Sequence, residues 1–342
     1  MAASASIVTA AVGVSALLAA LGVKKALKSV TANRGVTLPS LRAVDSSITE
    51  KSAYPENYYP GGVYAPLSFG DTHYFMFGPE DGKKVVFVHG LSTPTSVYDK
   101  VARTMAKNGC RVILYDLYSR GYSVGPPVDH DPLLYVTQLH ELLKFVGWKQ
   151  CNFVGLSLGG GILASYAHQF PESVQSLTFI APGGLLLPSE IPWVGKIFLL
   201  PYSEEIFSHP RIKTYFSGKN IESMRAEFKD APGGKVPEAI DAAAEILALQ
   251  YKHHAGYARG LMSTLRKFPL TDMRHIYASS QDQKYPVQVI WGTKDTVVPG
   301  STVVALEELI PRIKITKVQD ATHSIVMTHP EVIVEQLDGF VC

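Results

Sequence analysis

A serine between two glycines is the first group in this sequence that could do covalent chemistry. Ser157 lies within the segment Gly155-Leu-Ser-Leu-Gly159. The apolar residues 151–156 predict a buried strand before it, and residues 160–169 predict a helix after it. A Cβ at position 155 or 159 would collide with the adjoining strand or helix, and the turn pushes the serine hydroxyl into the open at the positive end of the helix. The segment therefore predicts a nucleophile elbow.

Two later residues could activate this serine. A serine hydroxyl reacts only when a base accepts its proton and an acid orients that base. Asp295 directly follows the strand predicted at 287–291, and His323 follows the strand predicted at 313–318. The carboxyl ends of parallel strands meet at one edge of a sheet. The order serine, acid, histidine along the chain therefore predicts a catalytic triad of Ser157, Asp295 and His323.

The other acids and histidines fit these roles less well. Asp282 and Asp320 do not directly follow a core strand with Gly before and Pro after, as Asp295 does. The remaining histidines lie at a helix start, around surface helices or in the long insert, and are expected to be solvated or packing side chains: His130, His140, His168, His253, His254 and His329. His89 ends a predicted strand and is expected to fix its loop rather than act as the base.

Two backbone N–H groups must stabilise the oxyanion of the tetrahedral intermediate. Leu158 directly follows the nucleophile at the start of the helix and is expected to supply one of them. Leu91 follows His89-Gly90 at the end of another predicted strand and is expected to supply the second.

The elements around these residues alternate between strand and helix. A hairpin is predicted over 64–77, with its turn at Gly70-Asp71, and buried strands follow at 84–89, 111–116, 151–156 and 176–181. Helical spacing separates them at 96–108, 133–146 and 160–169. This alternation predicts an α/β fold with a mostly parallel central sheet flanked by helices.

The alternation stops in the middle of the chain and then resumes. Residues 183–285 are helical and irregular, with apolar stretches and a helix near 236–251, whereas strands and helices alternate again from 286. We therefore expect a core in two segments, 61–182 and 286–342, with a helical cap at 183–285. The apolar stretches of the cap could line an acyl site, touch a bilayer or form ordinary core: Leu185–Leu187, Ile191–Trp193 and Ile197–Pro201.

The first 30 residues form an apolar leader. Ala5–Val23 carries no charge, and a helix of that length would rise roughly 28 Å, enough for a bilayer core. Its basic residues begin only at Lys24-Lys25, which favours an uncleaved membrane anchor with the rest of the chain in the cytosol. A signal peptide or a helix packed on the protein's own surface are the alternatives. Residues 31–60 lack a clear period and are expected to form a linker.

Composition excludes several classes of protein. With 46% apolar and 18% charged residues, the 342-residue chain can bury a substantial core. A net charge of +2 gives no reason to expect a nucleic-acid partner. Cys110, Cys151 and Cys342 form neither a disulfide framework nor a zinc-ligand pattern, so we expect no metal and no cofactor.

Five segments together resemble the α/β-hydrolase superfamily over residues 60–342: His89-Gly90, Asp116–Ser123, Gly155–Gly159, Gly292–Asp295 and Thr322-His323. The chain looks closest to membrane-anchored lipases and esterases of the monoacylglycerol-lipase type. The resemblance implies the same triad and the same two oxyanion donors. Ser157 sets the chain apart from relatives with an aspartate at the elbow, such as epoxide hydrolases, and the loop after His89 has one glycine rather than three.

The leading functional expectation is a serine hydrolase that cleaves carboxylic esters of lipid-like, small-molecule substrates. Fold alone does not fix the substrate, so a thioesterase, an amidase or a C–C bond hydrolase with the same triad are alternatives. A non-catalytic binding scaffold of the same fold is a further alternative, but such a scaffold is expected to have lost at least one of the three triad residues, and all three are present.

Overall fold

The computed structural model describes residues 36–190, 203–228 and 236–341. The predicted membrane anchor at Ala5–Val23 lies outside these residues, as do two of the three apolar stretches of the cap. Within the described ranges, no helix has the length and apolar character needed to cross a membrane.

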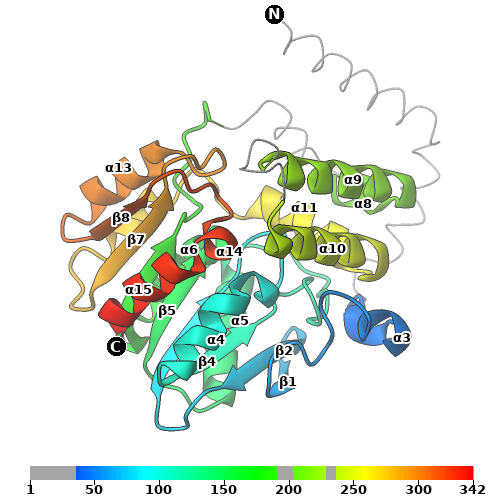
Figure 1. Ribbon diagram of the computed structural model, residues 1–342, viewed down its shortest axis with the longest axis horizontal. Coiled ribbons are helices and arrows are strands. Elements are labelled where there is room, and N and C mark those ends of the chain that lie inside the picture. Colours follow the sequence, from blue (N-terminus) through cyan, green and yellow to red (C-terminus); the bar gives the residue numbers. More distant parts are fainter. Residues whose placement is uncertain (1–35, 191–202, 229–235, 342) are drawn as a thin grey trace, which may run out of the picture.

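An eight-stranded sheet forms the centre of the molecule (Figure 1). In chain order its strands are β1 (Gly62–Leu67), β2 (Gly70–Phe77), β3 (Lys83–Val88), β4 (Cys110–Tyr115), β5 (Cys151–Leu156), β6 (Val174–Ile180), β7 (Val287–Gly292) and β8 (Lys314–Val318). Their order across the sheet is β1-β2-β4-β3-β5-β6-β7-β8. The pairs β1–β2 and β2–β4 are antiparallel and the other pairs are parallel, which confirms the mostly parallel sheet that the alternation predicts.

The strands are buried on both faces because helices cover both. Along β3, Val85 and Phe87 pack into one apolar layer, whereas Val86 and Val88 pack into the other. The first layer also contains side chains of α4 (Asp99–Lys107) and α15 (Pro330–Val341). The second contains side chains of α5 (Pro132–Phe145), α6 (Leu158–Gln169), α12 (Arg274–Ala278) and α13 (Gly300–Leu309). This double cover explains the nearly continuous apolar runs of the central strands.

The segment between β6 and β7 is largely helical. It contains α8 (Ser203–Ser208), α9 (Pro210–Ala226), α10 (Glu238–His253) and α11 (Tyr257–Lys267), which gather on one side of the sheet (Figure 1). These helices share their own apolar cluster, to which Phe207, Ile212, Leu247 and Leu261 belong. The following helix, α12, packs against α6 and α13 instead.

Residues 36–60, where the sequence predicts a linker, pack against the core. They form two short helices, η1 (Leu41–Ala43) and α3 (Ser46–Thr49), and bury Tyr54 and Tyr59 completely. The Tyr54 hydroxyl donates a hydrogen bond to Asp116 Oδ1 at 2.9 Å. This stretch is therefore irregular in backbone but part of the folded body.

The hairpin turn lies two residues earlier than expected. Leu67 pairs with Gly70, so Ser68 and Phe69 make the turn, and Gly70-Asp71 already belong to β2. The prediction was wrong because Gly70, with φ +118°, occupies the first position of the strand instead of the turn.

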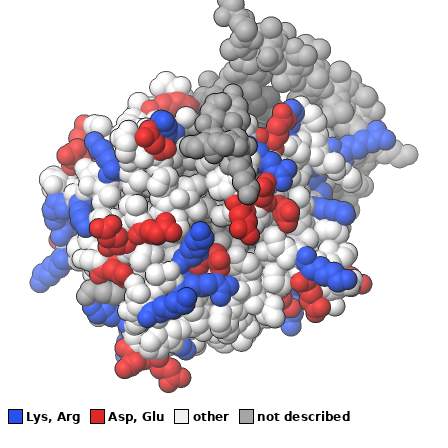
Figure 2. Space-filling model, in the orientation of Figure 1, with Lys and Arg blue, Asp and Glu red and all other residues white. Residues whose placement is uncertain are grey.

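Lys and Arg side chains are interspersed with Asp and Glu on the face drawn in Figure 2, with no large area of a single sign. Some exposed side chains of opposite charge form ion pairs, such as Lys219 with Glu222 at 2.7 Å and Arg274 with Glu308 at 3.1 Å.

Candidate active site

Ser157 occupies the sharp turn between β5 and α6. Its backbone angles, φ 52° and ψ −116°, lie in a region that non-glycine residues rarely adopt. The surrounding backbone holds it there, because Ser157 N–H donates to the Ile180 carbonyl at 2.9 Å and the Ser157 carbonyl accepts from Gly160 and Gly183 N–H. Strain of this kind is characteristic of functional turns, and the side chain remains partly exposed.

The two glycines of the elbow are required by close backbone contacts. A Cβ on Gly155 would lie 2.6 Å from the Gly159 carbonyl oxygen, and a Cβ on Gly159 would overlap the Val88 carbonyl oxygen. Both contacts are with backbone atoms, which cannot move aside as a flexible side chain could. The structure thus supplies the steric reason for the pattern at positions 155 and 159.

Asp295 and His323 meet at the carboxyl ends of β7 and β8. His323 Nδ1 lies 2.8 Å from Asp295 Oδ2, and the other carboxylate oxygen accepts from Val297 and Val298 N–H at 2.8 Å each. The Asp295 side chain is fully buried, whereas 22% of the His323 side chain is exposed. With Nδ1 bonded to the acid, Nε2 is the nitrogen left to exchange a proton with a substrate or nucleophile.

A cavity of about 510 Å³ joins His323 to Ser157, because both side chains line it. Its apolar side chains come mainly from the segment after β3, the end of α9, the loop after β7 and α14 (Ile325–Thr328): Leu91, Val97, Met224, Val297, Val326 and Met327. Polar residues of the same segments also line it: Ser92, Thr93, Ser223, Glu227, Thr296 and Ser324. The structure therefore brings the predicted nucleophile, base and acid to one concave site.

The predicted oxyanion donors lie at the same cavity. Leu158 is the first residue of α6, where N–H groups have no acceptor within the helix. Leu91 lines the cavity beside Ser157. A Cβ added to Gly90 would lie only 3.5 Å from the Ser157 Cβ, so the loop that carries Leu91 runs directly past the nucleophile.

His89 is a positioning residue, as the sequence predicts. It is completely buried, and its Nε2 accepts from Leu117 N–H at 2.9 Å while Nδ1 donates to the Gly90 carbonyl at 2.8 Å. Burial lowers the pKa of His89 to about 4, which keeps the imidazole neutral at physiological pH. Both ring nitrogens are occupied, so His89 has no free site to act as a base.

The competing acids lie apart from His323. Asp320 is exposed and pairs with Lys294 at 2.9 Å, and hydrogen bonding to that lysine lowers the pKa of Asp320. Asp282 is exposed in the turn before β7. Neither carboxylate contacts His323 in the described structure.

Several competing histidines pack inside the protein. His130 Nε2 lies 2.9 Å from Ser119 Oγ, and His254 Nε2 lies 3.0 Å from the Ser123 carbonyl oxygen. Both residues are buried, and burial lowers the pKa of His130 to about 3 and that of His254 to about 4. The expected surface position of His130 was wrong, because the cap covers it: Ser263 of α11 accepts its backbone N–H at 3.0 Å.

Sequence reasoning missed the part of the site that the cap supplies. Met224 and Glu227, at the end of α9, line the cavity opposite the strand ends. Gln250 of α10 and Tyr257 of α11 hydrogen-bond the Ser92 carbonyl, directly after Leu91. No motif marks these residues, and the only signal was their place within the predicted cap.

Metal ligands do not gather anywhere in the described ranges. No group of three or more His, Cys, Asp or Glu side chains there is arranged to hold a metal ion. Cys110 and Cys151 are both buried, and neither forms a disulfide within the described part of the chain.

A serine elbow follows β5, an acid follows β7 and a histidine follows β8. Together with the order of the strands in the sheet, these positions define an α/β-hydrolase. Residues 79–328 match the family described as serine aminopeptidase, S33. This match spans most of the chain, which belongs to that family of α/β-hydrolase-fold serine hydrolases.

Individual proteins similar to this chain share a low sequence identity with it. An uncharacterised protein of Mycobacterium tuberculosis, Rv2715, is 28% identical over 64% of this chain and 63% of its own length. Monoacylglycerol lipase ABHD6 of Mus musculus is 23% identical over 88% of this chain and 90% of its own. The structure of carboxylesterase CesB (YbfK) from Bacillus subtilis superposes with a TM-score of 0.66 at 17% identity, covering 83% of this chain and 93% of that one, which shows a shared fold.

Proposed function

We propose that this protein hydrolyses carboxylic esters of lipid-like substrates, such as monoacylglycerols, through Ser157, His323 and Asp295. The observation that carries the proposal is the 2.8 Å contact between His323 and Asp295 at a cavity that Ser157 also lines. A nucleophile, a base and the acid that orients it are the complete set of side chains that acyl transfer requires.

The first half of the reaction forms an acyl-enzyme. Ser157 Oγ attacks the ester carbonyl carbon while His323 Nε2 takes the hydroxyl proton, and Asp295 stabilises the resulting imidazolium. The N–H groups of Leu91 and Leu158 stabilise the oxyanion. The intermediate collapses as the C–O bond to the alcohol breaks, and His323 returns its proton to the leaving oxygen.

The second half regenerates the enzyme. A water molecule attacks the acyl carbonyl while His323 Nε2 accepts its proton, and a second tetrahedral intermediate forms at the same two N–H groups. Its collapse breaks the bond to Ser157 Oγ, which recovers its proton from His323, and the carboxylic acid leaves.

Two observations favour a lipid-like acyl group. Half of the residues that line the cavity besides Ser157 and His323 have apolar side chains, which an acyl chain can contact. One relative that aligns over most of both chains, ABHD6 of Mus musculus, is named as a monoacylglycerol lipase. Amide hydrolysis is the second candidate, because the family description names an aminopeptidase; thioester and C–C bond cleavage would use the same side chains.

Labelling with a fluorophosphonate tests the catalytic part of this proposal. Wild-type protein should be labelled on Ser157, and Ser157→Ala should not be labelled at all. A scaffold without catalysis would show no labelling in either protein. A panel of ester, thioester and amide substrates with the same acyl chain, each at several chain lengths, then tests the substrate. Faster turnover of the amide than of the ester would replace the esterase proposal with amidase activity.

We further propose that Ala5–Val23 anchors the enzyme in a membrane with the hydrolase domain in the cytosol. The uncharged run and its basic C-terminal flank support this orientation. Deleting residues 1–28 should release the protein from carbonate-washed membranes while turnover of a soluble short-chain ester stays unchanged. A mature N-terminus near residue 20, or a domain protected from protease in intact organelles, would contradict the anchor and leave the catalytic proposal intact.

A further inference from the structure

Buried side chains hold three successive carbonyl groups of the loop after β3. The Gly90 carbonyl accepts from His89 Nδ1 at 2.8 Å, and the Leu91 carbonyl accepts from Arg120 Nε at 2.7 Å. The Ser92 carbonyl accepts twice, from Gln250 Nε2 and from the Tyr257 hydroxyl, each at 2.9 Å. This loop carries the predicted oxyanion donor, so its orientation decides how well that donor works.

Both donors to the Ser92 carbonyl come from the cap. Gln250 lies on α10 and Tyr257 is the first residue of α11, more than 150 positions further along the chain. Neither side chain is exposed to solvent. Gln250 also accepts a hydrogen bond from Gly121 N–H at 2.9 Å, so its amide bridges two loops of the core.

Arg120 adds a buried positive charge to the same group of contacts. Its guanidinium is completely buried, and its described hydrogen-bond partners are carbonyl and hydroxyl oxygens: those of Leu91, Tyr118, Ser119 and Thr264. Burying an arginine is costly unless its donors are satisfied. A cation among neutral acceptors holds those carbonyls in place by charge-assisted hydrogen bonds.

Fixing a carbonyl also fixes the N–H of the same peptide. All described peptide bonds are trans, and in a trans peptide the C=O and N–H bonds point in opposite directions. The bond from His89 to the Gly90 carbonyl therefore aims Leu91 N–H away from His89, and the bonds to the Leu91 and Ser92 carbonyls orient the next two peptides. Leu91 and Ser92 line the catalytic cavity with Ser157.

We infer that Gln250 and Tyr257 are positioning residues for the oxyanion hole, so that the cap completes the catalytic machinery as well as covering it. The inference rests on the function proposed above. The contribution of such positioning is large, because displacement of a catalytic group by 1 Å can cost about 10²-fold in rate. A cap that moves away from the core would release the Ser92 carbonyl, and the loop that carries Leu91 N–H two peptide groups earlier would lose that support.

Two variants remove the cap's hydrogen bonds with little change in volume. Tyr257→Phe deletes one hydroxyl and keeps the ring that packs against Tyr251 at 4.8 Å. Combining it with Gln250→Met removes both donors to the Ser92 carbonyl. Tyr251→Phe is the matched control, because the Tyr251 hydroxyl accepts from Asn220 within the cap, at 2.9 Å, and does not contact the loop.

The readouts separate positioning from general stability. Tyr257→Phe should lower kcat about tenfold and the double variant about 10²-fold, with KM nearly unchanged, since the interaction acts on the transition state. The affinity for an alkyl trifluoromethyl ketone, which forms a hemiketal oxyanion on the serine, should fall by the same factors. The affinity for an unreactive ether of the same chain length should not change. Tyr251→Phe should leave kcat, KM and both affinities as in wild type.

Two results would overturn the inference. One is a Tyr257→Phe protein with wild-type kcat and wild-type trifluoromethyl ketone affinity. The other is an equal loss of ketone and ether affinity, which would indicate general damage to the cavity. If the double variant does not fold, the single variant decides, because it loses only one hydroxyl. Fluorophosphonate labelling of wild-type Ser157 tests the proposed function separately. A labelled enzyme whose Tyr257→Phe variant keeps wild-type kcat would therefore overturn the positioning role and leave the proposed function intact.

Discussion

Two aspartate–histidine pairs in the described residues differ in what surrounds them. In the candidate active site, His323 Nδ1 lies 2.8 Å from Asp295, and the imidazole is partly exposed at the cavity of Ser157. In the second pair, His73 Nδ1 lies 3.7 Å from Asp116 Oδ2, and both side chains are fully buried. The 2.8 Å distance is that of a hydrogen bond, whereas 3.7 Å is too long for one.

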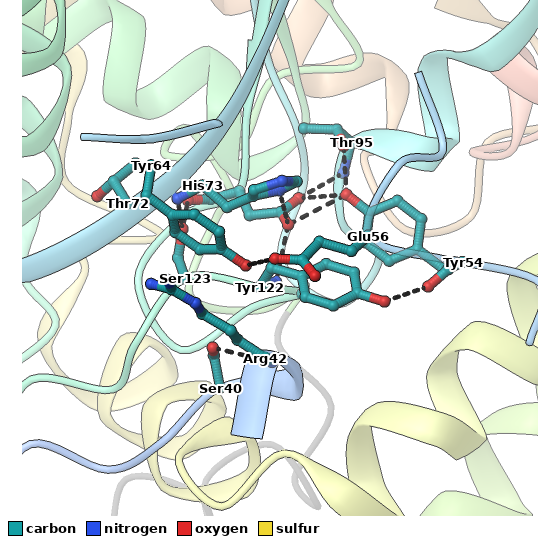
Figure 3. A network of polar contacts seen from close by, with 12 residues as sticks. Ser40, Arg42, Tyr54, Glu56, Tyr64, Thr72, His73, Thr95, Tyr122 and Ser123 are labelled. Carbon is teal, nitrogen blue, oxygen red and sulfur yellow. Dashed lines mark hydrogen bonds and ion pairs between the residues drawn. The ribbon is translucent and has the colours of Figure 1, made fainter. Parts of the chain in front are cut away.

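The buried pair belongs to a structural network (Figure 3). Asp116 accepts hydrogen bonds from the Tyr54 hydroxyl, from Thr95 N–H and from Tyr122 N–H, at distances of 2.9 to 3.2 Å. These contacts tie the segment before β1, the turn after β3 and the loop after β4 to one carboxylate. Burial alone would raise the pKa of Asp116, but nearby imidazoles and the Tyr122 N–H outweigh it and the pKa is lowered.

His73 lacks the features that make His323 a candidate base. Its ring packs against Tyr64, Phe75 and Tyr122, with centroids 4.6 to 5.2 Å apart. Neither ring nitrogen has a hydrogen-bond partner in the described structure. Proximity of an acid is by itself insufficient to make a histidine a general base. The imidazole also needs an accessible second nitrogen and a group with which to exchange a proton.

Removing the nucleophile or the base should give the largest effect. Ser157→Ala and His323→Ala should each lower kcat by about 10⁴-fold or more, and the double variant should lose little further, because the two residues act as one unit. The elbow depends on its glycines, so folding should be retained, as circular dichroism and thermal melting can check. A folded Ser157→Ala protein with substantial esterase activity would disprove the proposed mechanism.

Replacing each aspartate by asparagine contrasts the two pairs directly. Asp295→Asn should keep the fold but favour the wrong imidazole tautomer, with a loss of about 10⁴-fold in kcat. Asp116→Asn should instead destabilise the protein by about 3 kcal/mol, because it removes a buried charge from donors arranged around it. Urea unfolding and steady-state kinetics distinguish these outcomes. Near-normal activity in Asp295→Asn, with loss in Asp320→Asn or Asp282→Asn, would show that another residue is the acid.

Acidification should destabilise the folded protein because several of its histidines are buried. Burial lowers the pKa of His89 and His254 to about 4 and that of His130 to about 3, whereas an unfolded chain protonates histidine near pH 6.5. As the pH falls from about 6.5 toward 4, the unfolded state binds protons that the folded state excludes, so stability falls over this window. Tm measured between pH 7.5 and 4.5 should decrease, with a shallower slope in His254→Gln. A Tm that is constant from pH 7 to pH 5 would contradict this expectation.

Replacing the buried histidine should give the smallest effect. His73→Phe keeps a ring among the neighbouring aromatic side chains and removes two nitrogens that form no hydrogen bond. We expect kcat to stay within about twofold of wild type and the free energy of unfolding to fall by about 1 to 2 kcal/mol, because Asp116 loses an imidazole that lowers its pKa. The same substitution at His323 should abolish turnover. A large loss of kcat in a stable His73→Phe protein would mean that this pair also contributes to catalysis.

The sequence by itself determined the central strands and the order of serine, acid and histidine along the chain. The apolar runs before Ser157 and Asp295 predicted β5 and β7, because a parallel strand buried on both faces must be apolar along its length. The glycines around Ser157 predicted the elbow, because backbone contacts at those positions leave no space for a Cβ. These features are local, so they can be read from a short window of residues.

Only the tertiary structure decided which side chains act together across the fold. The sequence already favoured Asp295 over Asp320 as the acid, but only the folded chain shows the 2.8 Å contact of Asp295 with His323 and the pairing of Asp320 with Lys294. The role of Tyr257 and Gln250 at the Ser92 carbonyl depends on how α10 and α11 dock on the core, over sequence separations of 165 and 158 residues. A hydrogen bond between distant residues leaves no periodic pattern in the sequence, because its geometry arises only when the chain has packed.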